Sequence, residues 1–324
     1  MTKQMLSRRA PRKAPRPIWN KSPLERLLLS MRRNWDLYLI FLPVIAYYVI
    51  FLYKPMYGVQ IAFKDFSAAK GIWDSPWVGM DHFIRFFKGY FIKRLLFNTI
   101  TISLYSLAVG FITPILLALM LNEVRHSAFK RTVQTVTYAP HFLSTVVMVG
   151  MMIAILSPNN GLINNIIKLF SGQPINFMTL QEWFKTLYVF SGVWQGTGWG
   201  SIIYLAALSG IDPQLHESAQ IDGASRLRRI WHINLPGILP TIMILFILNC
   251  GSIMEIGFEK IYLMQNSANL PTSDVISTYV YRVGIQGAQY SFSAAAGLFN
   301  SVINFALLTL ANQLGKWTTD YSLW

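Results

Sequence analysis

Seven polar side chains fall inside long apolar segments of the sequence, where a polar group is costly and therefore suggests a function. These residues are Gln195, Thr197, Asn249, Ser252, Glu255, Asn300 and Asn304. Their amide, hydroxyl and carboxyl groups can pair with the hydroxyls of a polar solute, and Trp or Tyr faces can stack on its apolar side. They are therefore candidates for the lining of a substrate path. For each one taken alone, a hydrogen bond between helices is the more ordinary role.

A polar segment, residues 209–236, separates two of the apolar segments. Asp212 can cap a helix that has Pro213 at its first position. Gly223 can supply the positive φ that ends this helix. A second, basic helix is expected to run to Ile233, after which Pro236 opens the next apolar segment. The segment is therefore predicted to be a helix, a turn and a helix.

The first of these two helices has the side chains of a docking surface. Glu217 and Asp222 can offer carboxylates to Arg or Lys of a partner. Small residues leave a face that a partner can approach closely: Ser218, Ala219 and Ala224. The simpler alternative is that the two acids are solvated helix charges.

Several kinds of chemistry find no support in the sequence. It contains no Gly-x-x-x-x-Gly-Lys-Ser/Thr phosphate loop. The five histidines are scattered without metal-ligand spacing, and no Ser-His-Asp or paired-carboxylate arrangement is evident. The single cysteine, Cys250, has no partner for a disulfide. We predict no enzyme activity, no metal site and no cofactor in this chain.

The composition is that of an integral membrane protein. Of the 324 residues, 53% are hydrophobic and only 13% are charged, about half the roughly 25% of a soluble domain. Six apolar stretches are long enough to cross a bilayer, which needs about 20 helical residues. We expect these spans at residues 37–53, 97–121, 136–156, 186–208, 237–255 and 292–313. The fold class is therefore all-α, with a membrane domain over residues 37–324 that follows a basic tail, residues 1–36.

The tail sets the predicted orientation. It holds 10 of the 28 Lys and Arg residues, and such segments stay in the cytoplasm. Six spans then place both termini in the cytoplasm. Ser22 to Glu25 reads as a capping box that opens a short amphipathic helix on the anionic inner leaflet. The net charge of +14 thus reports membrane topology and anchoring. We expect membrane lipid, and not nucleic acid, as the partner of the tail.

Segment 209–236 closely resembles the EAA loop of permease subunits in binding-protein-dependent ABC importers. That loop reads Glu-Ala-Ala, Asp-Gly-Ala and Ile-x-Leu-Pro, and this chain has Glu217-Ser218-Ala219, Asp222-Gly223-Ala224 and Ile233-Asn234-Leu235-Pro236 at matching spacing. Ser218 is the one departure, a small-for-small change. Other segments resemble the carbohydrate branch and its lipoprotein- and polysaccharide-utilisation subgroup: 96–99, 139–144, 194–196, 257–263, 278–282, 289–292 and 323–324. The narrowest resemblance is to importers of alginate oligosaccharides.

The resemblance implies a type I ABC importer permease fold and a mechanism. The helix that contains Glu217 and Gly223 is implied to be a coupling helix, seated in a cleft of a cytoplasmic ATPase subunit. ATP and Mg are bound by two such partner subunits, whose closure rocks the spans from inward- to outward-facing. A second, related permease chain and an extracytoplasmic solute-binding protein complete the implied complex. Its substrate would be an oligosaccharide, with an acidic one such as alginate oligosaccharide as the specific candidate.

Two other classes of function remain as rivals. A secondary transporter driven by an ion gradient needs inverted repeats and buried ionisable groups at mid-membrane, and only Glu255, near a span end, approaches this. A non-transporting membrane anchor is the other rival, which the polar fourth span and the long outer segments disfavour. We expect a bacterial inner-membrane location.

Overall fold

The computed structural model describes residues 30–31, 33–319 and 321–324. The predicted capping box, and nearly all of the predicted amphipathic helix of the tail, fall outside the described residues. The chain forms two compact units, residues 1–59 and residues 60–324.

The first unit is dominated by one long apolar helix. Helix α2, Trp35–Tyr47, continues through the π-helical turn η2, Tyr48–Tyr53, into α3, Lys54–Met56. A 3₁₀ segment, η3, Tyr57–Phe63, follows. The resulting span extends beyond the predicted 37–53, and none of the residues in its most apolar window is buried.

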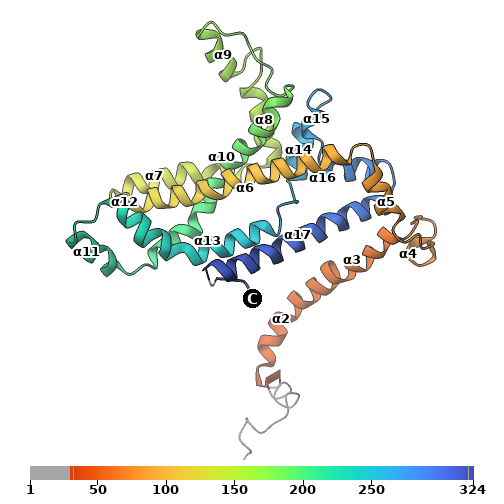
Figure 1. Ribbon diagram of the computed structural model, residues 1–324, viewed down its shortest axis with the longest axis horizontal. Helices are drawn as coiled ribbons and strands as arrows, with labels where there is room; N and C mark the ends of the chain where they lie inside the picture. The colour runs from red at the N-terminus through yellow and green to blue at the C-terminus, as the bar shows by residue number, and fades with distance from the viewer. Residues whose placement is uncertain (1–29, 32, 320) are drawn as a thin grey trace, which may run out of the picture. The chain divides into compact units, whose positions relative to one another are not determined.

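The second unit is built around four long helices, seen in Figure 1: α6, Ile92–Glu123; α10, Gln181–Ser209; α13, Leu235–Cys250; and α17, Tyr290–Thr319. Helix α10 packs along α6 and also touches α7, Ser127–Tyr138, and α13. Helix α13 in turn packs on α17. This arrangement places α10, the least apolar of the predicted spans, among other helices.

Shorter helices connect the long ones. They are α4, Gly71–Asp74; α5, Asp81–Lys88; α8, Thr145–Ile155; α9, Leu162–Leu169; α11, Pro213–Ile221; α12, Arg226–Arg229; α14, Phe258–Met264; α15, Leu270–Ser273; and α16, Ile276–Val280. Figure 1 shows α11 and α5 near opposite ends of the second unit.

Four helices of the described residues are long and apolar enough to cross a membrane: Trp35–Phe63, Ile92–Glu123, Arg226–Cys250 and Tyr290–Trp317. A fifth candidate is the pair Ser127–Phe142 and Thr145–Ile155, which bends by 103° at its break. The all-helical membrane fold is thus confirmed with four or five candidate spans. Helix α10 is not among them, because Ser191, Gln195 and four glycines dilute its apolar residues.

The predicted third span, 136–156, is wrong as one continuous helix. Its chain passes through a 3₁₀ turn, η4, Ala139–Phe142, which contains Pro140. A new helix then begins at Thr145, where the Ser144 hydroxyl accepts a hydrogen bond from Val147 N at 3.3 Å. Proline lacks the backbone N–H that a regular helix needs, and a serine cap favours the start of a new helix. Pro140 and Ser144 therefore account for the break.

The predicted separate basic helix up to Ile233 is also wrong in detail. Helix α12 continues through a π-helical turn, η5, Ile230–Asn234, directly into α13. Pro236 follows closely on this π-helical turn, because a proline inside a helix cannot donate the regular backbone hydrogen bond and so disturbs the α-helical pattern. The basic segment and the fifth predicted span are therefore one helix of 25 residues, Arg226–Cys250.

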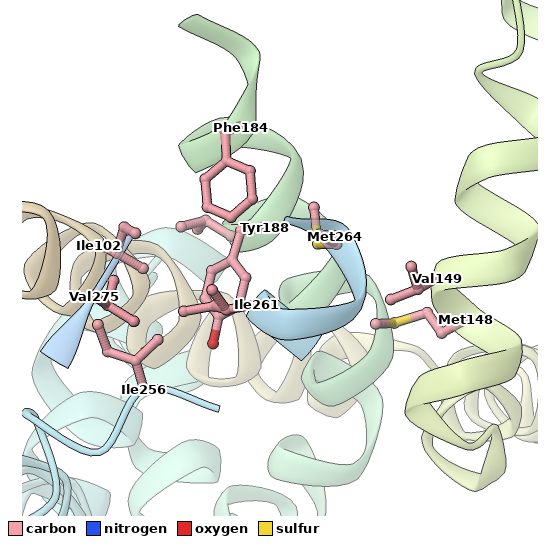
Figure 2. Close-up of a cluster of buried hydrophobic side chains, with 10 residues drawn as sticks. Ile102, Met148, Val149, Phe184, Tyr188, Ile256, Ile261, Met264 and Val275 are labelled. Carbon is pink, nitrogen blue, oxygen red and sulfur yellow. The ribbon is translucent and has the colours of Figure 1, made fainter. Parts of the chain in front are cut away.

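Two apolar clusters hold the long helices together at different levels. The first, drawn in Figure 2, joins α6, α8, α10 and α14; Phe184 and Tyr188 project into it from α10 and Met148 and Val149 from α8. The second joins α6, α10 and α13 through Ile115, Ala118, Leu119, Tyr204, Leu208 and Ile238. Burying several such side chains, at about 1.5–3 kcal/mol each, fixes α10 against α6.

Candidate functional site

A cavity of about 510 Å³ lies between α6, α10 and α13, the size of a small-molecule site. Its wall also includes the segment after α13, up to Lys260 on α14. Three glycines of α10 line it: Gly192, Gly196 and Gly200. Gly200 packs closely against α6, since an added Cβ there would lie 3.1 Å from Pro114. Gly196 instead has open space beside it, so it widens the cavity.

Four of the seven predicted substrate-path residues line this cavity: Thr197, Asn249, Ser252 and Glu255. The Thr197 hydroxyl donates to Val193 O and shares a 3.0 Å hydrogen bond with the Thr113 hydroxyl on α6. The Asn249 amide donates to Leu245 O at 2.7 Å. Polar groups of α10, α13 and the following turn thus line the same cavity.

The other three predicted residues, Gln195, Asn300 and Asn304, are not among the residues that line the cavity. The Gln195 amide donates to Leu143 O at 2.9 Å, which joins α10 to the turn before α8. The Asn304 amide oxygen accepts from Met254 N at 3.0 Å and ties α17 to the segment after α13. For these two, the geometry is that of the alternative interpretation, a hydrogen bond between elements.

One cavity residue was missed by sequence reasoning. Lys260, on α14, is 9% exposed and lines the cavity beside Gly192. Its ammonium donates to Tyr188 O at 2.7 Å and lies 4.5 Å from the Tyr188 ring centre. Burial lowers the pKa of Lys260 to about 8. Lys260 lies in a loop between two predicted spans, where a lysine is normally solvated. The signal that could have found it is the helical spacing of its buried neighbours, Ile261 and Met264.

The six predicted ATPase-coupling residues lie together at one end of the second unit, on α11 and the turn after it (Figure 1). As predicted, the Asp212 side chain caps α11, accepting from Gln214 N at 2.9 Å, and Pro213 is the first helical residue. Gly223 has φ +74°, as predicted for the residue that ends the helix. Helix α11 has no buried residue.

The exposed side chains of this loop are both charged and apolar. Glu217 and Asp222 are exposed, and within the described part of the chain neither carboxylate forms an ion pair. The Ile221 and Leu227 side chains are also open, with 86% and 70% of their surface accessible. A smaller hollow of about 360 Å³ lies between α11 and the end of α6, lined by Asn122, Glu123, Val124, Arg125, His216, Gln220, Arg226 and Arg229. Exposed acidic and apolar side chains thus occur together on α11, the turn after it and α12.

A bundle of apolar helices around a polar cavity, with an exposed helix at one end, defines a membrane transport subunit. The chain belongs to the family of binding-protein-dependent transport system inner membrane components, which it matches over residues 110–320. The resemblance drawn from segment 209–236, to a permease subunit of a carbohydrate ABC importer, is thereby confirmed.

Two relatives from Bacillus subtilis (strain 168) are similar over nearly the whole chain. The polygalacturonan/rhamnogalacturonan transport system permease protein YteP is 45% identical over 92% of this chain and 93% of its own length. Protein LplB is 42% identical over 94% of this chain and 96% of its own.

Solved structures are similar as well. The crystal structure of a bacterial ABC transporter involved in the import of the acidic polysaccharide alginate contains a chain that is 44% identical. The match covers 91% of the present chain and 99% of the chain in the crystal structure, with a TM-score of 0.84. A crystal structure of the bacterial alginate ABC transporter in complex with an alginate pentasaccharide-bound periplasmic protein gives 43% identity, 92% and 100% coverage and a TM-score of 0.85.

Family membership settles the broad biochemical role. The chain is a multi-pass permease of the bacterial inner membrane and acts as the transport subunit of an ABC importer, together with a binding protein. It is not an enzyme, and nucleotide hydrolysis belongs to a separate ATPase subunit.

Proposed function

We propose that this chain carries an acidic oligosaccharide through the cavity between α6, α10 and α13. The observation that carries the proposal is the cavity lining, which includes the hydroxyl and amide groups of Thr197, Asn249 and Ser252. Such groups match the hydroxyls of a sugar. The relatives named for polygalacturonan and for alginate transport support an acidic substrate, because both polymers are built with uronic acids. The saccharide would arrive from an extracytoplasmic binding protein.

We further propose that α11 is the coupling helix. Its exposed Glu217 and Asp222 offer carboxylates to a basic cleft of an ATPase subunit. Ser218 and Ala219, together with Ala224, let that cleft approach closely. Gly223 lets the chain reverse at positive φ immediately after α11, toward α12. Because α12 is continuous with α13, and α13 lines the cavity, movement of α11 would reach the substrate path through one helix.

The complete transporter is proposed to contain a second, related permease chain and two ATPase subunits. Membership in an ABC importer family supports an assembly of this chain with further subunits. Two copies of this chain are the alternative arrangement. Subunit composition of the purified complex distinguishes the two.

We propose six spans, with both termini in the cytoplasm. Helix α10 would be the span that composition alone leaves out, because it lies against α6, α7 and α13, where its polar residues meet protein. The 10 basic residues of the tail support a cytoplasmic N-terminus and an anchor on anionic lipid.

The test is to purify the complex through this chain and to measure its uptake of acidic oligosaccharide in liposomes with ATP inside and outside. We expect an ATPase subunit to co-purify. The exchange Glu217→Lys reverses a docking charge, and Gly223→Trp forces a side chain onto positive φ; each should abolish most ATP-driven uptake. Glu182→Lys is the matched control, because Glu182 is an exposed acid in the first turn of α10 and should leave uptake intact. Full uptake by a Glu217→Lys, Gly223→Trp double variant without any ATPase would overturn the coupling proposal.

A further inference from the structure

The cavity contains a buried positive charge. Among the described residues that line it, only Glu255 and Lys260 carry a formal charge at neutral pH. Lys260 is 9% exposed, whereas Glu255 is an exposed side chain that stays hydrated. No ion pair joins the two residues or links Lys260 to any other carboxylate of the described chain. The ammonium therefore sits at the cavity wall without a counter-ion.

The contacts of the Lys260 ammonium leave it able to bind a further group. An ammonium has three N–H donors, and the described structure engages it with one acceptor, Tyr188 O at 2.7 Å, and with the Tyr188 ring. The side chain is held in place, since α14 packs against α8 and Ile261 and Met264 are buried beside it. The absence of a side chain at Gly192 leaves room for it, because a Cβ there would lie 3.2 Å from Nζ.

A buried charge is costly unless it is paired or hydrogen-bonded. An apolar side chain of the same length could fill the space beside Ile261 at lower cost, so packing alone does not explain a lysine here. A carbonyl oxygen and a ring face compensate only part of the lost hydration. The geometry calls for an anion that enters the cavity and supplies the missing charge.

We infer that Lys260 is the anion-recognition residue of the cavity and that its ammonium binds the carboxylate of a uronic acid unit as the saccharide passes. The Tyr188 ring and carbonyl position the ammonium, and the hydroxyl and amide groups of Thr197 and Asn249 face the sugar hydroxyls. The inference rests on the proposed function, because it concerns the substrate of that same cavity. It goes further in assigning charge selectivity to one residue of the permease.

The test measures uptake of two saccharides by the complete reconstituted importer with its binding protein. One is an alginate oligosaccharide, and the other is the same oligosaccharide with its carboxyl groups reduced to alcohols. Lys260→Gln removes the charge but keeps a donor for Tyr188 O. We expect it to lower the acidic-to-neutral uptake ratio about tenfold relative to the unmodified importer, the loss for one charge-assisted hydrogen bond. Comparison with the unmodified importer cancels the selectivity of the binding protein.

A matched control is available on α10. The Lys185 ammonium is also partly buried, donates to the Thr101 hydroxyl at 2.7 Å and lies 4.7 Å from the Phe97 ring, but it does not line the cavity. Lys185→Gln should leave the uptake ratio unchanged, and Lys260→Arg should retain most of it. If Lys260→Gln slows both saccharides equally while Lys260→Arg does not restore uptake, Lys260 is structural and the inference is wrong. If the unmodified importer takes up neither saccharide, it is the proposed substrate class that fails.

Discussion

Two buried charges in this chain have opposite surroundings. The Asp274 carboxylate is fully buried, and it accepts hydrogen bonds from Arg94 at 3.1 Å and from Arg282 at 2.9 and 3.0 Å. The Thr278 hydroxyl also lies 3.3 Å from it. Lys260, by contrast, is buried with a carbonyl oxygen and a ring as its partners and has no carboxylate within ion-pair distance in the described chain. Asp274 lies among connecting helices, and Lys260 lies on a cavity.

The contrast separates a charge that holds the fold from a charge kept for a ligand. Asp274 joins two segments that are far apart in the sequence. Arg94 and Asn98 lie on α6, and the Asn98 amide also donates to Asp274 O at 3.0 Å, whereas Arg282 lies eight residues after Asp274. Both oxygens of its carboxylate are used within the chain. Lys260 leaves capacity unused and faces space of about 510 Å³. A buried charge whose hydrogen-bonding capacity is fully used within the chain thus stabilises the fold. A buried charge that faces a cavity with unused capacity is a candidate ligand-binding residue.

Breaking the paired region should have the largest effect. Asp274→Asn leaves Arg94 and Arg282 without their shared anion, which we expect to cost about 3 kcal/mol, the low end for a broken buried pair because both arginines are partly exposed. A lower melting temperature of the purified complex would show it. Asp65→Asn, at an exposed aspartate, is the control and should leave the melting temperature unchanged. Equal melting temperatures for the two variants would contradict the structural role of Asp274.

Two glycines of α10 also differ in this way: Gly198 packs against another helix, whereas Gly196 borders the cavity. An added Cβ at Gly198 would collide with the backbone carbonyl of Thr137 on α7, which cannot move by itself. We expect Gly198→Ala to destabilise the complex by roughly 1–3 kcal/mol, as overpacking does. Gly196→Ala is the control on the same helix, because nothing lies within 4 Å of its added Cβ. The relative melting temperatures of the two variants check this.

The pH dependence of uptake tests the unpaired charge. Since the pKa of Lys260 is lowered to about 8 by burial, the side chain is cationic below that pH and neutral above it. Acidic saccharide uptake, relative to the neutral saccharide, should therefore be full near pH 6.5–7 and fall several-fold as the pH rises past about 8. Tyr188, Tyr204 and Glu255 are the other titratable residues at the wall. The Lys260→Gln importer should show an acidic-to-neutral uptake ratio that does not change with pH. The same constant ratio from pH 7 to 9.5 in the unmodified importer would contradict the role of Lys260 in anion recognition.

The smallest expected effect comes from Gly192→Ala. The new methyl group would lie 3.2 Å from Lys260 Nζ, and the flexible end of the lysine can move aside by a few tenths of an ångström. We expect a twofold to threefold drop in the acidic-to-neutral uptake ratio, with no loss of stability. Titration of uptake against saccharide concentration would show it as a higher KM at unchanged maximal rate. A drop in the melting temperature instead would mean that Gly192 serves packing.

The sequence predicts the parts of this molecule whose signals are local. The Asp212 cap, the positive φ of Gly223 and the long apolar helices follow from residue types and spacing, because caps, glycine conformations and hydrophobicity act within one turn or one span. The family resemblance of segment 209–236 also follows, since it rests on consecutive residues.

Features that depend on contacts distant in the sequence could not be predicted. Whether Gln195 points at the cavity or at Leu143 depends on where the broken segment before α8 lies. Similarly, Lys260 is buried because α14 returns to pack against α8 and α10. A polar residue in an apolar segment therefore indicates a hydrogen bond. Whether its partner is protein or substrate depends on how the helices pack.

The most direct test of the distinction between the two charges is the acidic-to-neutral uptake ratio of Asp274→Asn and Lys260→Gln importers, measured side by side at one pH on equal amounts of assembled complex. The account predicts that Lys260→Gln lowers the ratio about tenfold and that Asp274→Asn leaves it unchanged while reducing the yield of stable complex. An unchanged ratio for Lys260→Gln, or a ratio that falls equally in both variants, would contradict it.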